Sequence, residues 1–174
     1  MFLIGEKVVY PLHGAGIIEA IEEKEVLGEK HTYYVLKLLM GGMKVMIPTN
    51  NVEKAGLRSV ISENEVDKVF QILENHTSEI IPNWKERQVD NLRKIKSGSI
   101  YKVAEVASSL SQKSREKELS TGERRLLDNA YQLIVSELSF AQDLPTEEVN
   151  GHLEKLLKRR FTIEKEVKKK ERRL

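Results

Sequence analysis

The hydrophobic residues change their spacing once along this chain, near residue 58, and that change limits the possible folds more than any other feature. Before this point, β-branched and aromatic residues form short runs separated by proline and glycine, as in small antiparallel sheets. After it, apolar residues recur at i, i+3, i+4 and i+7, which is typical of amphipathic helices. The sequence therefore predicts an α+β protein, with a small antiparallel β domain over residues 1–58 and an all-α domain over residues 59–174.

Four strands are expected in the first part, at residues 7–10, 16–21, 32–40 and 43–47. The pair Gly41-Gly42 separates the last two strands. A two-residue turn with positive φ at both positions favours residues that lack a Cβ atom. We therefore predict a hairpin at these two glycines.

Helix starts are marked by residues that cap free backbone N–H groups. Ser62 and Ser120 are each followed three residues later by glutamate, which is the spacing of a capping box. Asn83, directly after Pro82, can cap a helix that runs from Trp84 to about Lys96. A last helix is expected to begin near residue 145 and to lead into a basic tail at residues 161–174.

The composition argues against an enzyme. The 174 residues include no cysteine, which excludes a thiol nucleophile, disulfides and cysteine-bound metals. The four histidines are scattered, none in a spacing that places two metal ligands on one helix face, so neither a metal nor another cofactor is expected. No apolar run is long enough to span a bilayer, and the first residues do not form a signal peptide. We expect a cytoplasmic protein without catalytic activity.

The formal net charge of +2 conceals an uneven distribution. Residues 151–174 contain ten Lys or Arg and four Asp or Glu, and the rest of the chain has a net negative charge. Such a basic end is most often a solvated helix and less often a contact to nucleic acid or the ribosome. Charge alone does not identify the partner.

The only tryptophan, Trp84, lies at the start of an expected helix. At 100° per residue it falls within about 80° of three potential donors on the same helix, Arg87, Asn91 and Lys94. Arg and Lys can neutralise phosphates, Asn can bond a base edge, and a large apolar ring can insert into a minor groove beside an unstacked step. These four residues are the candidate DNA-binding site.

A structural role for Trp84 is the alternative, because lone tryptophans usually pack in a core. In that case Arg87 and Lys94 are ordinary solvated charges. Leu92 and Ile95, on the other side of the helix, are expected to face the core. Exposure of the Trp84 ring distinguishes the two interpretations.

Ordered motifs along the chain resemble the bacterial CarD family (CarD/CdnL-like), over roughly residues 2 to 141. In order, the motifs are residues 8–16 (VVYPLHGAG), 34–37 (YVLK), 48–51 (PTNN), 83–84 (NW), 91–92 (NL), 97–98 (SG), 102–106 (KVAEV) and 119–125 (LSTGERR). Each motif alone is weak, but their common order and spacing are specific.

The resemblance implies an N-terminal Tudor-like module that binds the RNA polymerase β subunit. It also implies a helical domain that contacts the minor groove of promoter DNA at the upstream edge of the transcription bubble. The family's wedge tryptophan falls on Trp84. On the polymerase side, a family basic position falls on Lys24, another is replaced by Met46, and we add Lys44 as a residue bordering this contact.

The sequence therefore predicts a monomeric transcription regulator that modulates open-complex stability. The alternative is a protein–protein adaptor whose basic tail binds RNA or the ribosome and whose Trp84 is purely structural.

Overall fold

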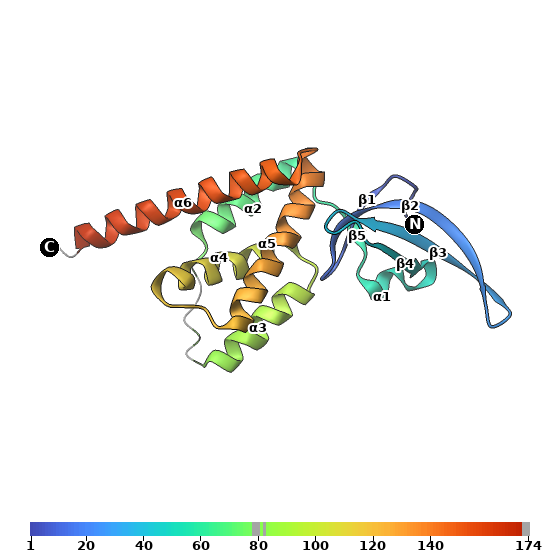
Figure 1. Cartoon of the computed structure of the whole chain (residues 1–174), viewed down its shortest axis with the longest axis horizontal. Coiled ribbons are helices and arrows are strands. Elements are labelled where there is room, and N and C mark those ends of the chain that lie inside the picture. Colours follow the sequence, from blue (N-terminus) through green and yellow to red (C-terminus); the bar gives the residue numbers. More distant parts are fainter. Residues whose placement is uncertain (78–80, 82, 172–174) are drawn as a thin grey trace.

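The computed structural model of the protein describes residues 1–77, 81 and 83–171, and for Glu164 the backbone alone. In this part of the chain an antiparallel sheet is followed by a group of helices, so the predicted α+β class is confirmed. The sheet and the helices lie end to end along the longest axis (Figure 1). Pro82, which was expected just before the helix at Trp84, lies outside the described residues.

The sheet has five strands in the order β4-β3-β2-β1-β5, and every neighbouring pair is antiparallel. The strands are β1 (Lys7–Tyr10), β2 (Gly14–Val26), β3 (Glu29–Leu38), β4 (Lys44–Pro48) and β5 (Arg58–Ser59). The four expected strands are present, with β2 longer than predicted. The short β5 was not predicted, because two residues carry too little alternation to be recognised.

One face of the sheet carries its own hydrophobic cluster. Ile18 of β2, Leu36 of β3 and Ile47 of β4 are at most 3% exposed and pack against Leu57. The 3-10 helix η1 (Thr49–Asn51) and the short helix α1 (Val52–Ala55) lead into this residue and help to close the cluster. Apolar residues at alternate strand positions thus bury one face, as period-two spacing requires.

The hairpin between β3 and β4 differs in one detail from the expected two-residue turn. Gly41 and Gly42 both have positive φ, at 75° and 62°, as predicted. The last bond across the hairpin joins the N–H of Leu38 to the carbonyl of Met43, at 2.9 Å. The loop therefore contains four residues, 39–42, and the glycines supply only its second half.

The helical part contains five helices within the described residues: α2 (Glu63–Asn75), α3 (Trp84–Lys96), α4 (Ile100–Glu116), α5 (Thr121–Gln142) and α6 (Thr146–Glu171). The capping boxes at Ser62 and Ser120 are both present, and the Asn83 side chain accepts a hydrogen bond from the N–H of Lys85. Local capping therefore sets these helix starts as predicted. None of the described helices combines the length and hydrophobicity needed to cross a bilayer.

An ion pair with a buried carboxylate joins the sheet to the helices. Arg58 of β5 donates two hydrogen bonds to the Glu137 carboxylate of α5, at 2.6 and 2.8 Å, and a third to the carbonyl of Gly98, at 2.8 Å. The Glu137 side chain is only 3% exposed and also accepts the N–H of Ile61, at 3.1 Å. Bidentate contacts of this kind fix orientation as well as distance.

A second contact brings the backbone of β2 against α5. The N–H of Ala15 donates to the Ser136 hydroxyl at 3.0 Å. Gly14 has a φ of +93°, and a Cβ atom there would lie 2.8 Å from the Ser136 hydroxyl oxygen. Only glycine fits this close approach without strain. The sheet and the helices are therefore held in one defined orientation.

Candidate nucleic-acid interface and polymerase-facing surface

Helix α3 presents Trp84 to solvent. Because Asn83 caps the helix, Trp84 occupies its first turn, where the body of the protein does not cover it. The side chain is 60% exposed, and the Lys85 ammonium lies 5.7 Å from the ring centroid. A ring this exposed is not a packing anchor, so the exposure favours the DNA-contact interpretation over a purely structural role.

Most of α3 lies outside the helical core. Ile95 is the only buried residue of this helix and is 1% exposed. The expectation that Leu92 also faces the core was wrong, because Leu92 is 38% exposed. Val89, at 66%, is exposed as well. The helix runs along the edge of the helical group (Figure 1), so only its last turn reaches the core and its first turns keep an apolar surface in water.

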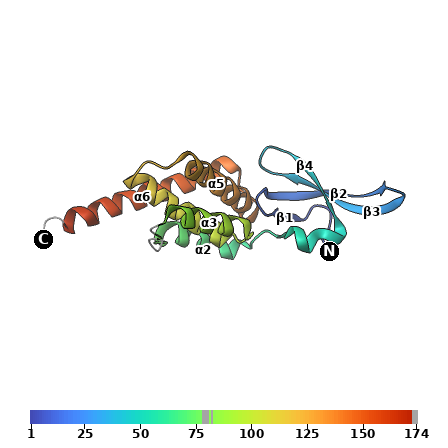
Figure 2. The ribbon, with the colours of Figure 1, turned by 90° about the horizontal axis from the view of Figure 1, so that it is seen from below.

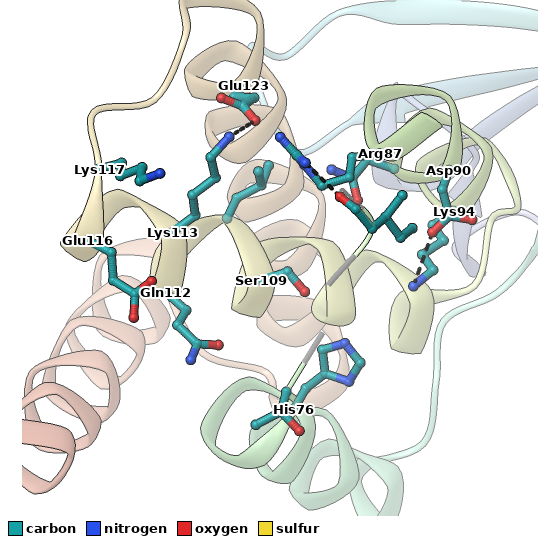
Figure 3. A pocket seen from close by; sticks show the side chains of 14 residues that line it. His76, Arg87, Asp90, Lys94, Ser109, Gln112, Lys113, Glu116, Lys117 and Glu123 are labelled. Carbon is teal, nitrogen blue, oxygen red and sulfur yellow. Dashed lines mark hydrogen bonds and ion pairs between the residues drawn. The ribbon is translucent and has the colours of Figure 1, made fainter. Parts of the chain in front are cut away.

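A cleft of about 760 Å³, lined mainly by charged and polar residues, lies between α3 and α4. Figure 3 shows Arg87 and Lys94 of α3 and, across the cleft, Lys113 of α4 and Lys117, the residue that follows this helix. Asn91 also lines this cleft, so three of the four predicted DNA-binding residues are brought together there. Trp84 lines an adjoining hollow instead, which shares Lys113 with the cleft.

The predicted donors are engaged within the free protein. The Arg87 guanidinium donates to the carbonyl of Ile81 at 2.6 Å. The Lys94 ammonium lies 2.9 Å from Glu105 and 3.5 Å from Asp90. Phosphate binding at these side chains must therefore compete with internal partners, whereas the Trp84 ring is available without rearrangement.

Sequence reasoning missed Lys113 and Lys117. Lys113 belongs to α4 and Lys117 directly follows that helix, so a helical projection of residues 84–96 cannot include them. The available signal was their i, i+4 spacing near the end of α4, but that spacing is equally typical of basic residues that stabilise a helix C-terminus.

Two charge interactions set the electrostatics of the cleft. Burial raises the pKa of Glu123, but hydrogen bonds from Lys113 and from the N–H of Ser120 outweigh it, so the pKa lies below its ordinary value of 4.5. Burial lowers the pKa of His76, with Lys94 and Arg160 acting in the same direction and Glu105 opposing them. The cleft therefore holds an ionised Glu123 and a neutral His76 at neutral pH.

The substitution Glu123→Gln tests the first of these interactions. It keeps the shape of the capping box and removes the ion pair with Lys113, so the free energy of unfolding should fall by about 1 kcal/mol at neutral pH. A carboxylate with a lowered pKa stabilises the fold above its unfolded pKa and loses that effect as pH falls through the folded pKa. Urea unfolding should thus show a difference from the unmodified protein at neutral pH that begins to shrink below the unfolded pKa, about 4.3, and disappears once the pH lies below the folded pKa of Glu123.

Glu118→Gln is the matched control, because the Glu118 side chain is 89% exposed and its contact with Arg124 is long, at 3.6 Å. We expect no change in stability from this variant at either pH. A pH-independent loss in Glu123→Gln would contradict the role of the charge.

The three residues predicted to border the polymerase contact meet on one face of the sheet. Met46 of β4 pairs with Val35 of β3, and the Lys24 ammonium of β2 lies 3.2 Å from the Met46 sulfur. Lys44, two residues before Met46 and thus on the same face, forms an ion pair with Glu19 at 2.6 Å. We call this surface, whose predicted partner is RNA polymerase, the polymerase-facing surface; it is formed by β2 and β4, the two strands that flank β3 in the sheet.

Among the described residues, no group of three or more His, Asp or Glu lies close enough together to hold a metal ion.

Comparison with known proteins identifies the family. The family model for the CarD-like/TRCF RID domain matches residues 2–61, and the model for the CarD C-terminal domain matches residues 68–154. The Bacillus subtilis (strain 168) protein YdeB, named as a candidate transcription factor, is 41% identical over 151 residues, which cover 87% of this chain and 99% of that protein. The chain belongs to the CarD family. The predicted resemblance and the Tudor-like N-terminal fold are confirmed.

Two solved structures of CarD-family N-terminal domains are similar to the first part of this chain. The solution NMR structure of the 72-residue N-terminal domain of Myxococcus xanthus CarD is 36% identical, covers 34% of this chain and 79% of its own, and gives a TM-score of 0.30. CdnLNt from the same organism is 47% identical, with 36% and 87% covered and a TM-score of 0.32.

As a CarD-family member, the protein is a transcription regulator with an N-terminal RNA polymerase-interacting domain. The CarD C-terminal model ends at residue 154, whereas α6 continues to Glu171. The distal part of α6 therefore extends beyond what the two family models describe.

Proposed function

We propose that this protein bridges RNA polymerase and promoter DNA, and that it thereby shifts the equilibrium between the closed and open complexes. Its polymerase-facing surface, with Lys24, Lys44 and Met46, binds the β subunit. Its helix α3 contacts the minor groove at the upstream edge of the bubble, where Trp84 inserts beside an unstacked step. The observation that carries the proposal is the exposed Trp84 ring at the start of α3.

The surroundings of Trp84 support this role. An exposed indole and an exposed Val89 lie on a helix that is bordered by cationic side chains of the cleft. Proteins that bend DNA from the minor groove combine an apolar wedge with basic residues that bind the flanking phosphates. The adaptor alternative requires a structural Trp84, and a ring that is 60% exposed does not favour it.

The two surfaces act together through linkage. A protein shifts an equilibrium only by its differential affinity for the two states, so a wedge that fits an opened junction stabilises the open complex. Because polymerase binding raises the local concentration of the wedge at the promoter, weak DNA affinity is sufficient. The Arg58–Glu137 ion pair keeps the two surfaces at a defined separation.

An initiation assay in vitro tests the proposal. Purified cognate polymerase forms open complexes on promoters of differing stability, and their half-lives are measured after addition of competitor, with and without this protein. We expect the half-life to lengthen, most on the promoter whose open complex is least stable. Half-lives that are unchanged on every promoter would refute the proposed function.

Charge reversal tests the polymerase-facing surface. The double variant Lys24→Glu and Lys44→Glu should bind the β subunit roughly tenfold more weakly, because like charges then face the partner. Its affinity should also depend less on salt. The measurement is a binding titration at several salt concentrations.

Lys54→Glu is the control for this reversal, because Lys54 is an exposed lysine on α1, outside the polymerase-facing surface. We expect this variant to bind the β subunit normally. Equal losses in both proteins would show that net charge, and not this face, determines binding.

A further inference from the structure

The distal part of α6 projects past the other helices and ends on the side of the molecule away from the sheet (Figure 1, Figure 2). The helix has 26 residues. At 1.5 Å per residue, this corresponds to a length of roughly 39 Å. The start of α3 lies farther from the sheet than its end does, and α6 extends well beyond it (Figure 1).

Contacts with α4 fix the direction of α6. Arg115 donates to the carbonyl of Leu157 at 2.9 Å, and its guanidinium carbon lies 5.2 Å from the centroid of the Phe161 ring. Further along, the Lys168 ammonium lies 2.9 Å from the Glu116 carboxylate. These contacts join the last two residues of α4 to about three turns of α6, from Leu157 to Lys168, so the distal part of α6 presents a defined outer face.

Arg160 strengthens this attachment from inside the core. It is only 8% exposed and donates to the carbonyls of Leu73 and His76, at 2.7 and 2.9 Å, and to the Ser108 hydroxyl. A buried guanidinium that satisfies the last carbonyls of α2 ties α6 to the helical core.

The outer face of α6 is cationic. Lys155, Arg159, Lys169 and Lys170 fall within about 100° of one another at 100° per residue. All four are exposed, and none forms an ion pair with another residue in the part of the chain that the structure describes. Glu166 is the acidic residue that lies among them. The face therefore has an uncompensated positive charge.

We propose that this outer face of α6 binds the phosphate backbone of duplex DNA, as a second contact in addition to that of Trp84. The inference goes beyond the proposed function and takes from it only the choice of DNA as the ligand. Basic side chains on a rigid helix suit the closely spaced phosphates of a duplex, which they bind without reading the base sequence.

The aromatic residue of α6 argues for a duplex over a single strand. Proteins that bind single strands use exposed aromatic rings on which bases stack. Phe161 is half-buried, and its ring is flanked by Arg115 and by the Lys165 ammonium at 4.2 Å. It offers no open platform for a base, so contact with the backbone is the chemistry left to this face.

The test uses the full chain without polymerase and a fully paired DNA duplex of mixed sequence. The triple variant Arg159→Gln, Lys169→Gln and Lys170→Gln should bind this duplex about tenfold more weakly at low salt. The magnitude of the slope of log affinity against log salt should fall by about two to three units. Each lost phosphate contact reduces this magnitude by about 0.9. The control variant Lys30→Gln, Lys37→Gln and Lys54→Gln removes the same charge from exposed lysines at the sheet end and should bind normally.

Equal losses in the control variant would overturn the inference, because net charge alone would then explain them. An unchanged salt slope in the α6 variant would also overturn it, as would a larger loss for single-stranded RNA or for a polyglutamate competitor than for the duplex.

Trp84→Ala separates this inference from the proposed function. Trp84 carries no charge, so its replacement removes no phosphate contact of α6. A failure of Trp84→Ala to alter open complexes would refute the wedge, whereas the α6 contact depends on the salt slope of the α6 variant alone.

Discussion

Replacing Arg58 with methionine is expected to lower the free energy of unfolding by about 3 kcal/mol, the largest stability effect that we predict for a single side chain. Among the described residues, the substitution leaves the Glu137 carboxylate, 3% exposed, with the N–H of Ile61 as its one remaining donor. An unpaired buried charge costs about 3–5 kcal/mol. We expect the lower end of this energy range because the Arg58 side chain is itself 31% exposed, so water can enter the space that it leaves.

Urea unfolding followed by circular dichroism measures this effect, and two variants make it specific. Lys7→Met removes an ion pair with Asp143, whose side chain is 83% exposed, and should change stability by less than about 1 kcal/mol. The double variant Arg58→Met and Glu137→Met removes both charges and should recover much of the loss, because an apolar pair needs no ionic partner. A loss in Arg58→Met no larger than that in Lys7→Met would contradict a structural role for the Arg58–Glu137 pair.

The Arg58 variant also tests whether the two surfaces need a fixed separation. Gly98, whose carbonyl accepts the third hydrogen bond of Arg58, lies between α3 and α4. Arg58 therefore connects the sheet to the helix junction next to the candidate DNA-binding helix. A variant that folds but holds this junction loosely should bind the β subunit normally and stabilise open complexes less.

Replacing Trp84 with alanine is expected to shorten the open-complex half-life roughly tenfold and to leave the fold intact. Base–aromatic contacts contribute about 1–3 kcal/mol to nucleic-acid binding, and 1.4 kcal/mol corresponds to a factor of ten. Because the ring is 60% exposed, its removal opens no cavity in the core. A core tryptophan would instead cost about 3–5 kcal/mol of stability when truncated.

Val89→Ala is the matched control, since Val89 is an apolar residue on the same helix and is 66% exposed. Thermal unfolding should be nearly unchanged in both variants, and the half-life should change strongly only in Trp84→Ala. The effect should also be largest where the duplex is being opened, because insertion is favourable only when unstacking costs little. An unfolded Trp84→Ala protein, or one that maintains the normal half-life, would falsify the wedge.

Features that depend on neighbouring residues could be predicted from the sequence. The start of α3 at Trp84 follows from the Asn83 cap, and the starts of α2 and α5 follow from the Ser62 and Ser120 capping boxes. Each of these signals acts over three or four residues, so it is visible in the chain itself. The family motifs, which are also short, identified the candidate wedge at Trp84.

Features that depend on packing between distant segments were decided only by the tertiary structure. A helical projection treats Leu92 and Ile95 alike, but α3 lies at the edge of the helical group, and only Ile95 reaches the core. Arg58 and Glu137 are 79 residues apart in the chain, and nothing in their sequence surroundings marks them as partners. Charge patterns show which residues can pair, but the energy of a pair depends on the distance and burial that only the folded chain provides.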